Sequence, residues 1–230
     1  MARKVAPTPA PSLVTPAPPP APPINLNVLV RPMTWPSAKI IHRIHPHDYK
    51  AGEFNPGLKG NARFSPIVDA GGNSIATIYG GETFDCAAME TVFHDVPFAP
   101  GLKSVMKRKL RKHDYSQVLP ARDLTLADLS STALRRLGVA RGQLIDTEKD
   151  QYPYTRTWAE AIYAQCPGVD GLCWVSRQDD KARAIVLFGD RLSATPLTPC
   201  AASVDIVTDA PTYAAVVDLA EEIGVKLIGR

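Results

Sequence analysis

The sequence predicts an α+β fold, a single domain in which helices flank a mixed sheet. Predicted strands and helices are intermingled along the chain but lack the regular strand–helix–strand alternation of a doubly wound fold. The 230 residues, of which 45% are hydrophobic, suffice for one sizeable core. No segment repeats itself, and no apolar run approaches the length of a transmembrane helix.

A proline-rich segment, residues 1–36, precedes the predicted domain, which we expect to begin near Ser37 and to span residues 37–230. The segment contains the run APTPAPSLVTPAPPPAPPI, which we expect to be extended, polyproline-like and solvated. Arg3 and Lys4 are not followed by an apolar stretch, so we expect no signal peptide. We interpret the segment as a tether or a disordered tail. A docking peptide or a delivery segment is an alternative that no residue supports directly.

The first predicted strand is AKIIHRIHP, which starts at Ala38 and is ended by Pro46. A loop rich in glycine, asparagine and proline follows it, and this loop holds Arg63 beside Phe64. The segment NSIATIYGG, residues 73–81, predicts a short strand closed by two glycines. We expect this strand to lead directly into a helix.

The segment TFDCAAMETVFHD, residues 83–95, predicts one amphipathic helix capped by Thr83. Apolar or small residues recur at positions i, i+3, i+4 and i+7, which is typical of a helix face packed on a core. Glu90 lies among largely apolar neighbours, and no lysine or arginine stands one turn away to pair with it. This carboxylate therefore needs an explanation.

The remaining elements follow from the same kinds of pattern. A basic segment, PGLKSVMKRKLRKH, has its apolar residues at helical spacing, and a short helix further on is ended by a glycine. Proline near the first position marks the start of the last helix. We predict helices over 100–113, 131–138 and 154–165 and at the start of 211–230, and strands over 122–130, 171–176, 182–190 and the end of the chain.

Composition and motifs exclude several classes of function. The net charge of +3 is too small to indicate nucleic-acid binding by itself. The chain lacks the G-x-G-x-x-G, G-x-x-x-x-G-K-[ST] and G-x-S-x-G motifs, which argues against Rossmann, P-loop and α/β-hydrolase proteins. The four cysteines form no C-x-x-C pair, so we expect small buried residues of a reduced, cytoplasmic protein: Cys86, Cys166, Cys173 and Cys200.

Three histidines stand close together in HRIHPH, and they raise the possibility of a zinc site. In a strand, His45 and His47 share one face while His42 points to the other. No further Cys or His completes a tetrahedral set, so we expect no metal. Arg43 lies in the same strand among apolar residues, where a buried guanidinium needs an anion.

Five polar residues stand where they can converge on one cleft: Arg43, Arg63, Tyr79, Glu90 and Ser176. Cleavage of the N-glycosidic bond of NAD needs such a set. Arginines bind a pyrophosphate by bidentate, charge-assisted hydrogen bonds, and a tyrosine ring stacks on nicotinamide. A preorganised carboxylate stabilises the positive charge that builds on the ribose. Taken singly, each residue also fits a structural role, Glu90 as a half-exposed helical residue and Ser176 as a turn residue after a strand.

Four motifs of this chain resemble those of the RES-domain family: HRIHP, GNARFSPI, TIYGGETFDCAAMETVFHDVP and DGLCWVSRQDD. Their order and spacing over residues 40–190 carry the resemblance, which leaves out the proline-rich segment and the last helix. The resemblance implies an ADP-ribosyltransferase-like fold and an NAD-consuming toxin of a toxin–antitoxin pair. It further implies a helical DNA-binding antitoxin that holds the toxin inactive.

The resemblance assigns a role to each of the five polar residues. Arg63, in NARF, matches the arginine of the family's GRW motif, and Arg43 matches the arginine of the first strand; both would hold the dinucleotide. Tyr79 would orient the nicotinamide, and the signature glutamate, Glu90, would stabilise the oxocarbenium-like state. The signature serine, Ser176, would line the pocket.

One position departs from the family pattern, because Phe64 follows the second arginine where the family often has tryptophan. The aromatic ring is kept, but the hydrogen bond of an indole is lost. NAD is expected as a substrate, and ADP-ribose passes to water, phosphate or a protein side chain; the residues do not decide among these acceptors. Neither direct nucleic-acid nor membrane binding is expected.

Two other functions compete with this interpretation. In the first, the chain is a non-enzymatic module that binds nucleic acid or an acidic protein through the basic segment 103–113, although such a charge run is more often a solvated helix face. In the second, the chain is a ribonuclease-type toxin, which needs a histidine or lysine acid–base pair. Only HRIHPH offers histidines that lie close together.

Overall fold

The computed structural model describes residues 18–229 except for positions 58, 193 and 195. The extended character expected for residues 1–17 lies outside this part of the chain. None of the helices in the described residues has the length and apolarity needed to cross a bilayer. These helices are α1 Leu26–Leu29, α2 Phe84–Met89, α3 Lys107–Leu110, α4 Ser131–Leu137, α5 Arg141–Leu144, α6 Tyr152–Gln165 and α7 Ala210–Glu222, with 3-10 turns η1 Lys149–Gln151 and η2 Asp190–Leu192.

Most strands belong to one mixed sheet with the order β1-β8-β9-β10-β5-β2-β7-β11, and β12 also pairs with β7. The pair β8–β9 is parallel, and the other pairs of this sheet are antiparallel. The α+β class with a mixed sheet is thus confirmed. The bounds of its strands are β1 Pro32–Trp35, β2 Ile41–Pro46, β5 Thr77–Gly81, β7 His113–Pro120, β8 Leu124–Asp128, β9 Gly171–Val175, β10 Arg183–Phe188, β11 Leu197–Pro199 and β12 Val204–Asp205.

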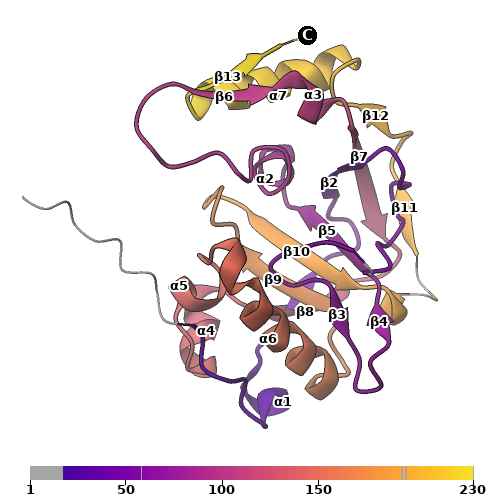
Figure 1. Ribbon diagram of the computed structural model, residues 1–230. Coiled ribbons are helices and arrows are strands. Elements are labelled where there is room, and N and C mark those ends of the chain that lie inside the picture. The colour runs from indigo at the N-terminus through magenta and orange to yellow at the C-terminus, as the bar shows by residue number, and fades with distance from the viewer. Residues whose placement is uncertain (1–17, 58, 193, 195, 230) are drawn as a thin grey trace, which may run out of the picture.

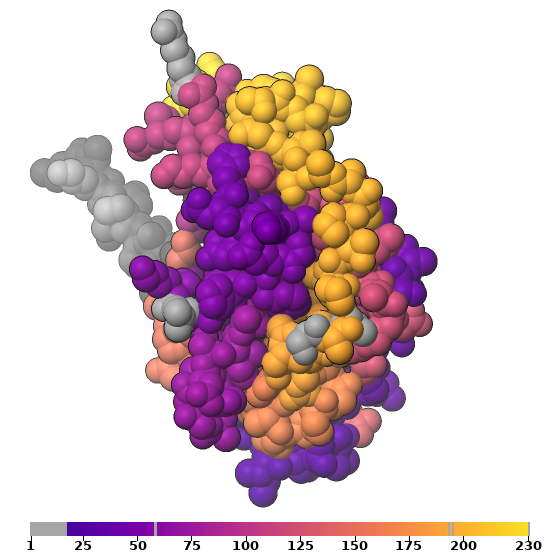
Figure 2. Space-filling view, turned by 90° about the vertical axis from the view of Figure 1, so that its right-hand side faces the viewer, coloured from indigo at the N-terminus to yellow at the C-terminus, as the bar shows by residue number. Residues whose placement is uncertain are grey.

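Two short ribbons flank the main sheet. The antiparallel pair of β3 (Ile67–Val68) and β4 (Ser74–Ile75) precedes β5, and β6 (Lys103–Met106) pairs in parallel with β13 (Val225–Ile228). In Figure 1, α1, α4, α5 and α6 gather beside the β8–β9–β10 part of the sheet, whereas α2, α3 and α7 lie beside β2 and β7. In Figure 2, the gold and yellow residues of the C-terminal part form a strip beside the indigo and magenta N-terminal half.

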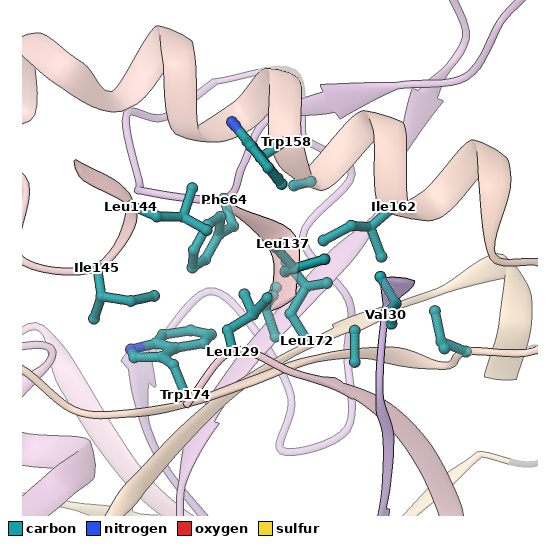
Figure 3. Packing of buried hydrophobic residues seen from close by; sticks show 14 of the residues in the cluster. Val30, Phe64, Leu129, Leu137, Leu144, Ile145, Trp158, Ile162, Leu172 and Trp174 are labelled. Atoms are coloured by element: carbon teal, nitrogen blue, oxygen red, sulfur yellow. The ribbon is translucent and has the colours of Figure 1, made fainter. Parts of the chain in front are cut away.

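The core has three clusters of buried hydrophobic residues. Each of the two groups of helices packs on one cluster, and the third cluster consists mainly of sheet residues. One cluster joins α4 and α6 to the sheet and contains Phe64, Trp158 and Trp174 (Figure 3). A second is built from sheet residues such as Ile185, and a third packs α2 and α7 around Phe93. Segments far apart in the sequence are therefore fixed against one sheet.

Several predicted elements are confirmed with small changes of boundary. The strand that contains HRIHP is β2, the two apolar segments near the C-terminal half are β9 and β10, and the amphipathic segment before the last strand is α7. The short helix α4 ends at Gly138 with φ 71°, the left-handed conformation that glycine favours.

The basic segment does not form the helix that its spacing predicted. It forms β6 and the single turn α3, because Val105 and Leu110 are buried and β6 pairs with the distant β13. A pairing partner at the other end of the chain overrides the local pattern. The polar strand β7, HDYSQVLP, was likewise missed, although its second half alternates between buried and half-buried residues.

Ordered structure extends upstream of Ser37, where the sequence suggested that the domain begins. Helix α1 buries Leu26 completely, and β1 pairs with β8 and buries Trp35. The prolines around these residues concealed them. The cysteine prediction also needs one correction, since Cys200 is exposed while the other three cysteines are buried.

Candidate active site

A cavity of about 410 Å³ opens between β2, β5, the end of α2 and the start of α6. Its wall includes Arg43, Arg63, Tyr79 and Glu90, so the structure brings four of the five sequence-predicted residues together. The volume lies in the range of small-molecule sites. Ser176, the fifth residue, is not part of the wall.

Glu90 caps the C-terminal end of α2, because the helix predicted over residues 83–95 ends at Met89. Thr83 is the N-cap as predicted, and its hydroxyl accepts a hydrogen bond from the N–H of Cys86 at 3.0 Å. Beyond Glu90 the chain leaves the helix in tight turns that carry the side chain of Phe93 fully into the core. The carboxylate thus stands at the end of a helix, where it faces the cavity.

Glu90 is not the unpaired carboxylate that its helical neighbours suggested. Its Oε1 accepts a hydrogen bond of 2.6 Å from the hydroxyl of Ser176. Its Oε2 lies 3.9 Å from Nη1 of Arg63. The side chain of Glu90 is 16% exposed and that of Arg63 is 3% exposed. Both partners come from distant segments of the chain, so helical spacing could not reveal them.

Ser176 lies behind Glu90. It was expected to line the cavity, but it is not part of the cavity wall. Its side chain is fully buried directly after β9. The hydroxyl oxygen accepts hydrogen bonds of 3.0 Å from the N–H groups of Gln178 and Asp179, and its own proton goes to Glu90. Donor and acceptors are all used, so the hydroxyl fixes the carboxylate and has little capacity left for a ligand.

Arg63 has two side-chain nitrogens that lack partners within the described chain. It is 4% exposed, yet its Nε and Nη2 have no hydrogen-bond partner among the described residues. The guanidinium carbon lies 5.7 Å from the ring centroid of Tyr152, and the Arg63 carbonyl accepts a hydrogen bond from the hydroxyl of Thr155. Buried polar groups are nearly always paired, so donors left free in a cavity wall fit an anionic ligand.

Arg43 is satisfied by backbone carbonyls and not by the anion that the sequence suggested. Its Nε donates to the carbonyl of Tyr79 at 3.1 Å, and its Nη1 donates to the carbonyls of Lys50 and Ala51. Burial lowers the pKa of Arg43 to about 10, an effect that Glu53 partly offsets, so the group is charged at neutral pH. Arg43 therefore ties β5 to the loop after β2 and adds positive charge to the cavity wall.

Tyr79 supports the loop that carries Arg63. Its hydroxyl accepts a hydrogen bond of 3.1 Å from the N–H of Phe64, and burial raises its pKa to about 12. Phe64 is completely buried and lies edge-on to Trp174, with ring centroids 5.1 Å apart. The position that departs from the family pattern is therefore in the core behind the cavity, and the cavity's own indole belongs to Trp174.

Tyr79→Phe tests this support. The variant leaves the Phe64 N–H without its partner, so we expect the free energy of unfolding to fall by about 1–3 kcal/mol at pH 7. Folded Tyr79 holds its proton more tightly than the unfolded chain, whose tyrosine pKa is about 10. The wild-type protein consequently loses stability as the pH rises from 10 towards about 12, and the variant should lose less over this window.

Urea unfolding at pH 7 and pH 11 measures both effects. Tyr154→Phe is the matched control, because Tyr154 is 49% exposed on α6. We expect this control to unfold like the wild type at both pH values. Equal stabilities of Tyr79→Phe and the wild type at pH 7 would contradict the proposed support of the arginine loop.

Sequence reasoning missed a polar network at the mouth of the cavity. Tyr152 is buried, and its hydroxyl lies 3.2 Å from Nε2 of His94, whose Nδ1 lies 2.9 Å from Asp95. Lys149 bonds to the same carboxylate, and together with His94 it lowers the pKa of Asp95 to about 2. Tyr152 was missed because the predicted helix over 154–165 began just after it. The remaining three residues of the network do not recur at a spacing that would have indicated a shared site.

Trp174 was also missed as a site residue. It lies in the cavity wall, and its indole N–H is buried with no partner in the part of the chain that the structure describes. The residue was recognised as part of a buried strand, and strand patterns do not show which core residue faces a cavity. Its free donor adds to those of Arg63.

The three histidines of HRIHPH have separate partners. His42 bonds to the hydroxyl of Tyr115 at 2.7 Å, and His45, in the cavity wall, bonds to the hydroxyl of Ser116 at 2.8 Å. The ligand atoms of His47, Asp114 and Asp205 lie within 4.8 Å of one another. Both nitrogens of His47 face acceptors, Asp114 at 2.8 Å and the Arg111 carbonyl at 2.6 Å, and the carbonyl raises its pKa. Hydrogen bonds at both ring nitrogens therefore fix His47 in this cluster.

A comparison with protein families gives a match that covers the whole cavity. The model of the RES domain matches residues 40–209, which include every wall residue discussed above and Ser176. Neither a curated protein nor a solved structure matches the chain. The match leaves out α1, β1, α7 and β13.

Proposed function

The chain belongs to the RES-domain family, which is associated with NAD-acting enzymes, and we propose that it is a toxin that consumes NAD. The reaction is cleavage of the bond between nicotinamide and ribose. One observation carries the proposal: a buried arginine with two unpartnered donors lies beside a carboxylate in the wall of one cavity. The arginine suits the anionic pyrophosphate of the substrate, and the carboxylate suits the positive charge that develops on its ribose.

Binding rests on the donors that the protein leaves free. Arg63 binds the pyrophosphate of NAD through Nε and Nη2, which replaces its missing partners. Arg43 adds positive charge but keeps its carbonyl partners, a more structural role than the resemblance implies. The rings of Tyr79 and Trp174 in the cavity wall offer apolar surface to the nicotinamide, and the indole N–H suits its carboxamide oxygen.

The chemistry rests on Glu90. When the C1′–N bond breaks, its electron pair leaves with neutral nicotinamide and positive charge develops on the ribose. The Glu90 carboxylate stabilises this charge, and the Ser176 hydroxyl keeps the carboxylate in place. A nucleophile then bonds to C1′ and releases a proton. That nucleophile is water, phosphate or a protein side chain, and the product is ADP-ribose or its adduct.

The direct test is incubation of the purified protein with NAD and a cell extract. We expect release of nicotinamide, and mass spectrometry of the ADP-ribose moiety then distinguishes the three acceptors. Free ADP-ribose identifies a glycohydrolase. ADP-ribose that carries phosphate on the carbon released from nicotinamide, C1′ above, identifies a phosphorylase, and a modified protein identifies a transferase. An absence of nicotinamide release under all of these conditions would refute NAD cleavage.

Ser176→Ala tests the positioning role of this serine. The variant removes the hydrogen bond to Oε1 of Glu90 and frees the N–H groups of Gln178 and Asp179. We expect kcat for nicotinamide release to fall by about 10²-fold, the effect of a slightly misplaced catalytic group. We also expect a loss of about 1–3 kcal/mol in the free energy of unfolding.

The matched control for this variant is Ser130→Ala. Ser130 also follows a strand and donates to a carboxylate, that of Asp128 at 3.0 Å, but it lies outside the cavity wall. We expect it to lower stability without lowering kcat. Equal effects of both variants on kcat would show that Ser176 contributes only to stability.

A helical DNA-binding antitoxin is the partner that we propose, because a free NAD-consuming enzyme would poison its own cell. The unpartnered donors of Arg63 give such an inhibitor a site for an acidic side chain or a C-terminal carboxylate. NAD and the antitoxin should then compete for the cavity. A nicotinamide-release assay on the purified pair at rising NAD concentrations tests this. Inhibition that NAD does not relieve would place the antitoxin elsewhere.

The rival function, binding through the basic segment 103–113, involves a separate surface. Arg108, Lys109, Arg111 and Lys112 are exposed on α3 and the turn after it, and none of them lies in the cavity wall. Nucleic-acid binding that weakens steeply with salt, together with no NAD turnover, would favour this function.

A further inference from the structure

Residues 18–25 of the proline-rich segment lie along the helices of the core. In Figure 1 it runs in indigo past α5 and α4 to α1. Three side chains donate hydrogen bonds to its carbonyls: Gln143 to Pro18 at 3.4 Å, Trp158 to Pro20 at 2.9 Å and Gln165 to Pro23 at 3.1 Å. The acceptor carbonyls lie outside the matched part of the family, whereas the three donors lie inside it. None of these contacts has a role in the proposed reaction.

The segment presents one face to the helices. Pro19, Pro22 and Pro23 are half-buried, whereas Pro18, Pro20 and Ala21 are exposed. A polyproline helix has three residues per turn, which places Pro19 and Pro22 on the same side. The backbone of a polyproline helix makes no internal hydrogen bonds and proline has no N–H, so the prolines of the segment can be held only through their carbonyls and ring contacts.

The protein side of the contact is rigid. Trp158 is 1% exposed and packs against the core cluster, and Figure 3 shows its ring nitrogen turned away from Phe64 and Leu144. Gln165 is fixed twice, because its Oε1 also accepts a hydrogen bond of 2.9 Å from the N–H of Leu26. Aromatic side chains are the usual receptors of polyproline ligands, and here the indole of Trp158 donates to the proline-rich backbone.

We propose that this surface, the proline groove of Gln143, Trp158 and Gln165, is a binding site for proline-rich peptides. Residues 18–25 are its ligand in cis. The segment is held through few contacts, and two of its five proline rings are exposed and the other three only half-buried, so a second peptide of the same chemistry can replace it. The groove therefore accepts a proline-rich segment of another protein, with the chain's own segment as a tethered competitor.

The test uses the full chain and a fluorescent synthetic peptide with the sequence of residues 18–25, PPPAPPIN. Binding is measured by fluorescence anisotropy. Pro19→Gly combined with Pro22→Gly removes two half-buried rings and weakens the cis ligand. Pro97→Gly combined with Pro100→Gly is the matched control, because it introduces the same number of glycines at the same spacing, at exposed positions of the loop after α2.

The first variant should bind the peptide at least tenfold more tightly than the wild type, because a tethered competitor acts at an effective concentration of about 1 mM. The control should stay closer to the wild type. Adding Gln165→Met to the first variant removes both hydrogen bonds of Gln165 and should weaken binding, whereas Ala164→Met, at an exposed neighbour on α6, should not.

Three outcomes would overturn the proposal. They are equal affinity for the wild type and the first variant, no binding to that variant at millimolar peptide, and no effect of Gln165→Met. Should the glycine variant not fold, the same question is asked of a chain carrying Cys200→Ser and a fluorophore on Ala21→Cys. Unlabelled peptide is then expected to lower the anisotropy of the label, and constant anisotropy at millimolar peptide means that the segment is a fixed part of the fold.

Discussion

Glu90→Gln is expected to lower the rate of nicotinamide release from NAD by about 10²–10³-fold, the effect of removing one preorganised electrostatic partner. Glutamine keeps the shape of the side chain and still accepts the hydrogen bond from Ser176. Only the negative charge that faces the developing cation is lost. Single-turnover measurements at saturating NAD show the effect on the chemical step, since KM should change much less than kcat.

Glu148→Gln is the matched control for this change of charge. The side chain of Glu148 is 76% exposed, pairs with Arg177 and does not line the cavity. We expect its kcat to stay within about twofold of the wild type, because exposed ion pairs contribute little. Unchanged turnover in Glu90→Gln, with the control also unchanged, would remove Glu90 from the mechanism.

Arg63→Met is expected to abolish the stabilisation of the protein by NAD without lowering the stability of the free protein. In the wild type, NAD at 100 times its Kd should raise the free energy of unfolding by about 2.7 kcal/mol. Arg63 carries the free donors that NAD would satisfy, so this gain should vanish in the variant. Thermal unfolding with and without NAD measures both quantities.

The free protein should tolerate this substitution because the guanidinium is buried with two unmatched N–H groups, and leaving such groups unpaired is costly. Methionine fills much of the same volume without that cost. Arg136→Met is the control, because Arg136 donates to the carbonyl of Val28 and lies outside the cavity wall. If NAD still stabilises Arg63→Met as much as it stabilises the wild type, residues other than Arg63 bind the pyrophosphate.

The parts of the fold that were predicted correctly are those whose signal is local. The apolar runs of β9 and β10 and the cap at Thr83 depend on neighbours within a few residues. The failures are elements that depend on distant pairing. Strand β6 forms because β13 lies beside it, and α2 stops early because the side chain of Phe93 enters the core.

The candidate site divides in the same way. Residue types and the family resemblance identified Arg43, Arg63, Tyr79 and Glu90, and these four share one cavity wall. Their partners could not be predicted, because each hydrogen bond joins segments that only the fold brings together. Ser176 shows the limit most clearly: its residue type was recognised, but only its burial reveals that it acts through Glu90.

The short strand β1 has a consequence for the behaviour of the chain after proteolysis. It lies at one end of the main sheet and covers β8 from Pro32↔Ala127 to Trp35↔Leu124. With four residues and a proline at its start, it is a poor template for further strands. Cleavage just before Ser37 and loss of β1 would leave the outer edge of β8 unpaired, while β9 still covers its other edge. Two chains can join and aggregate at such an exposed edge.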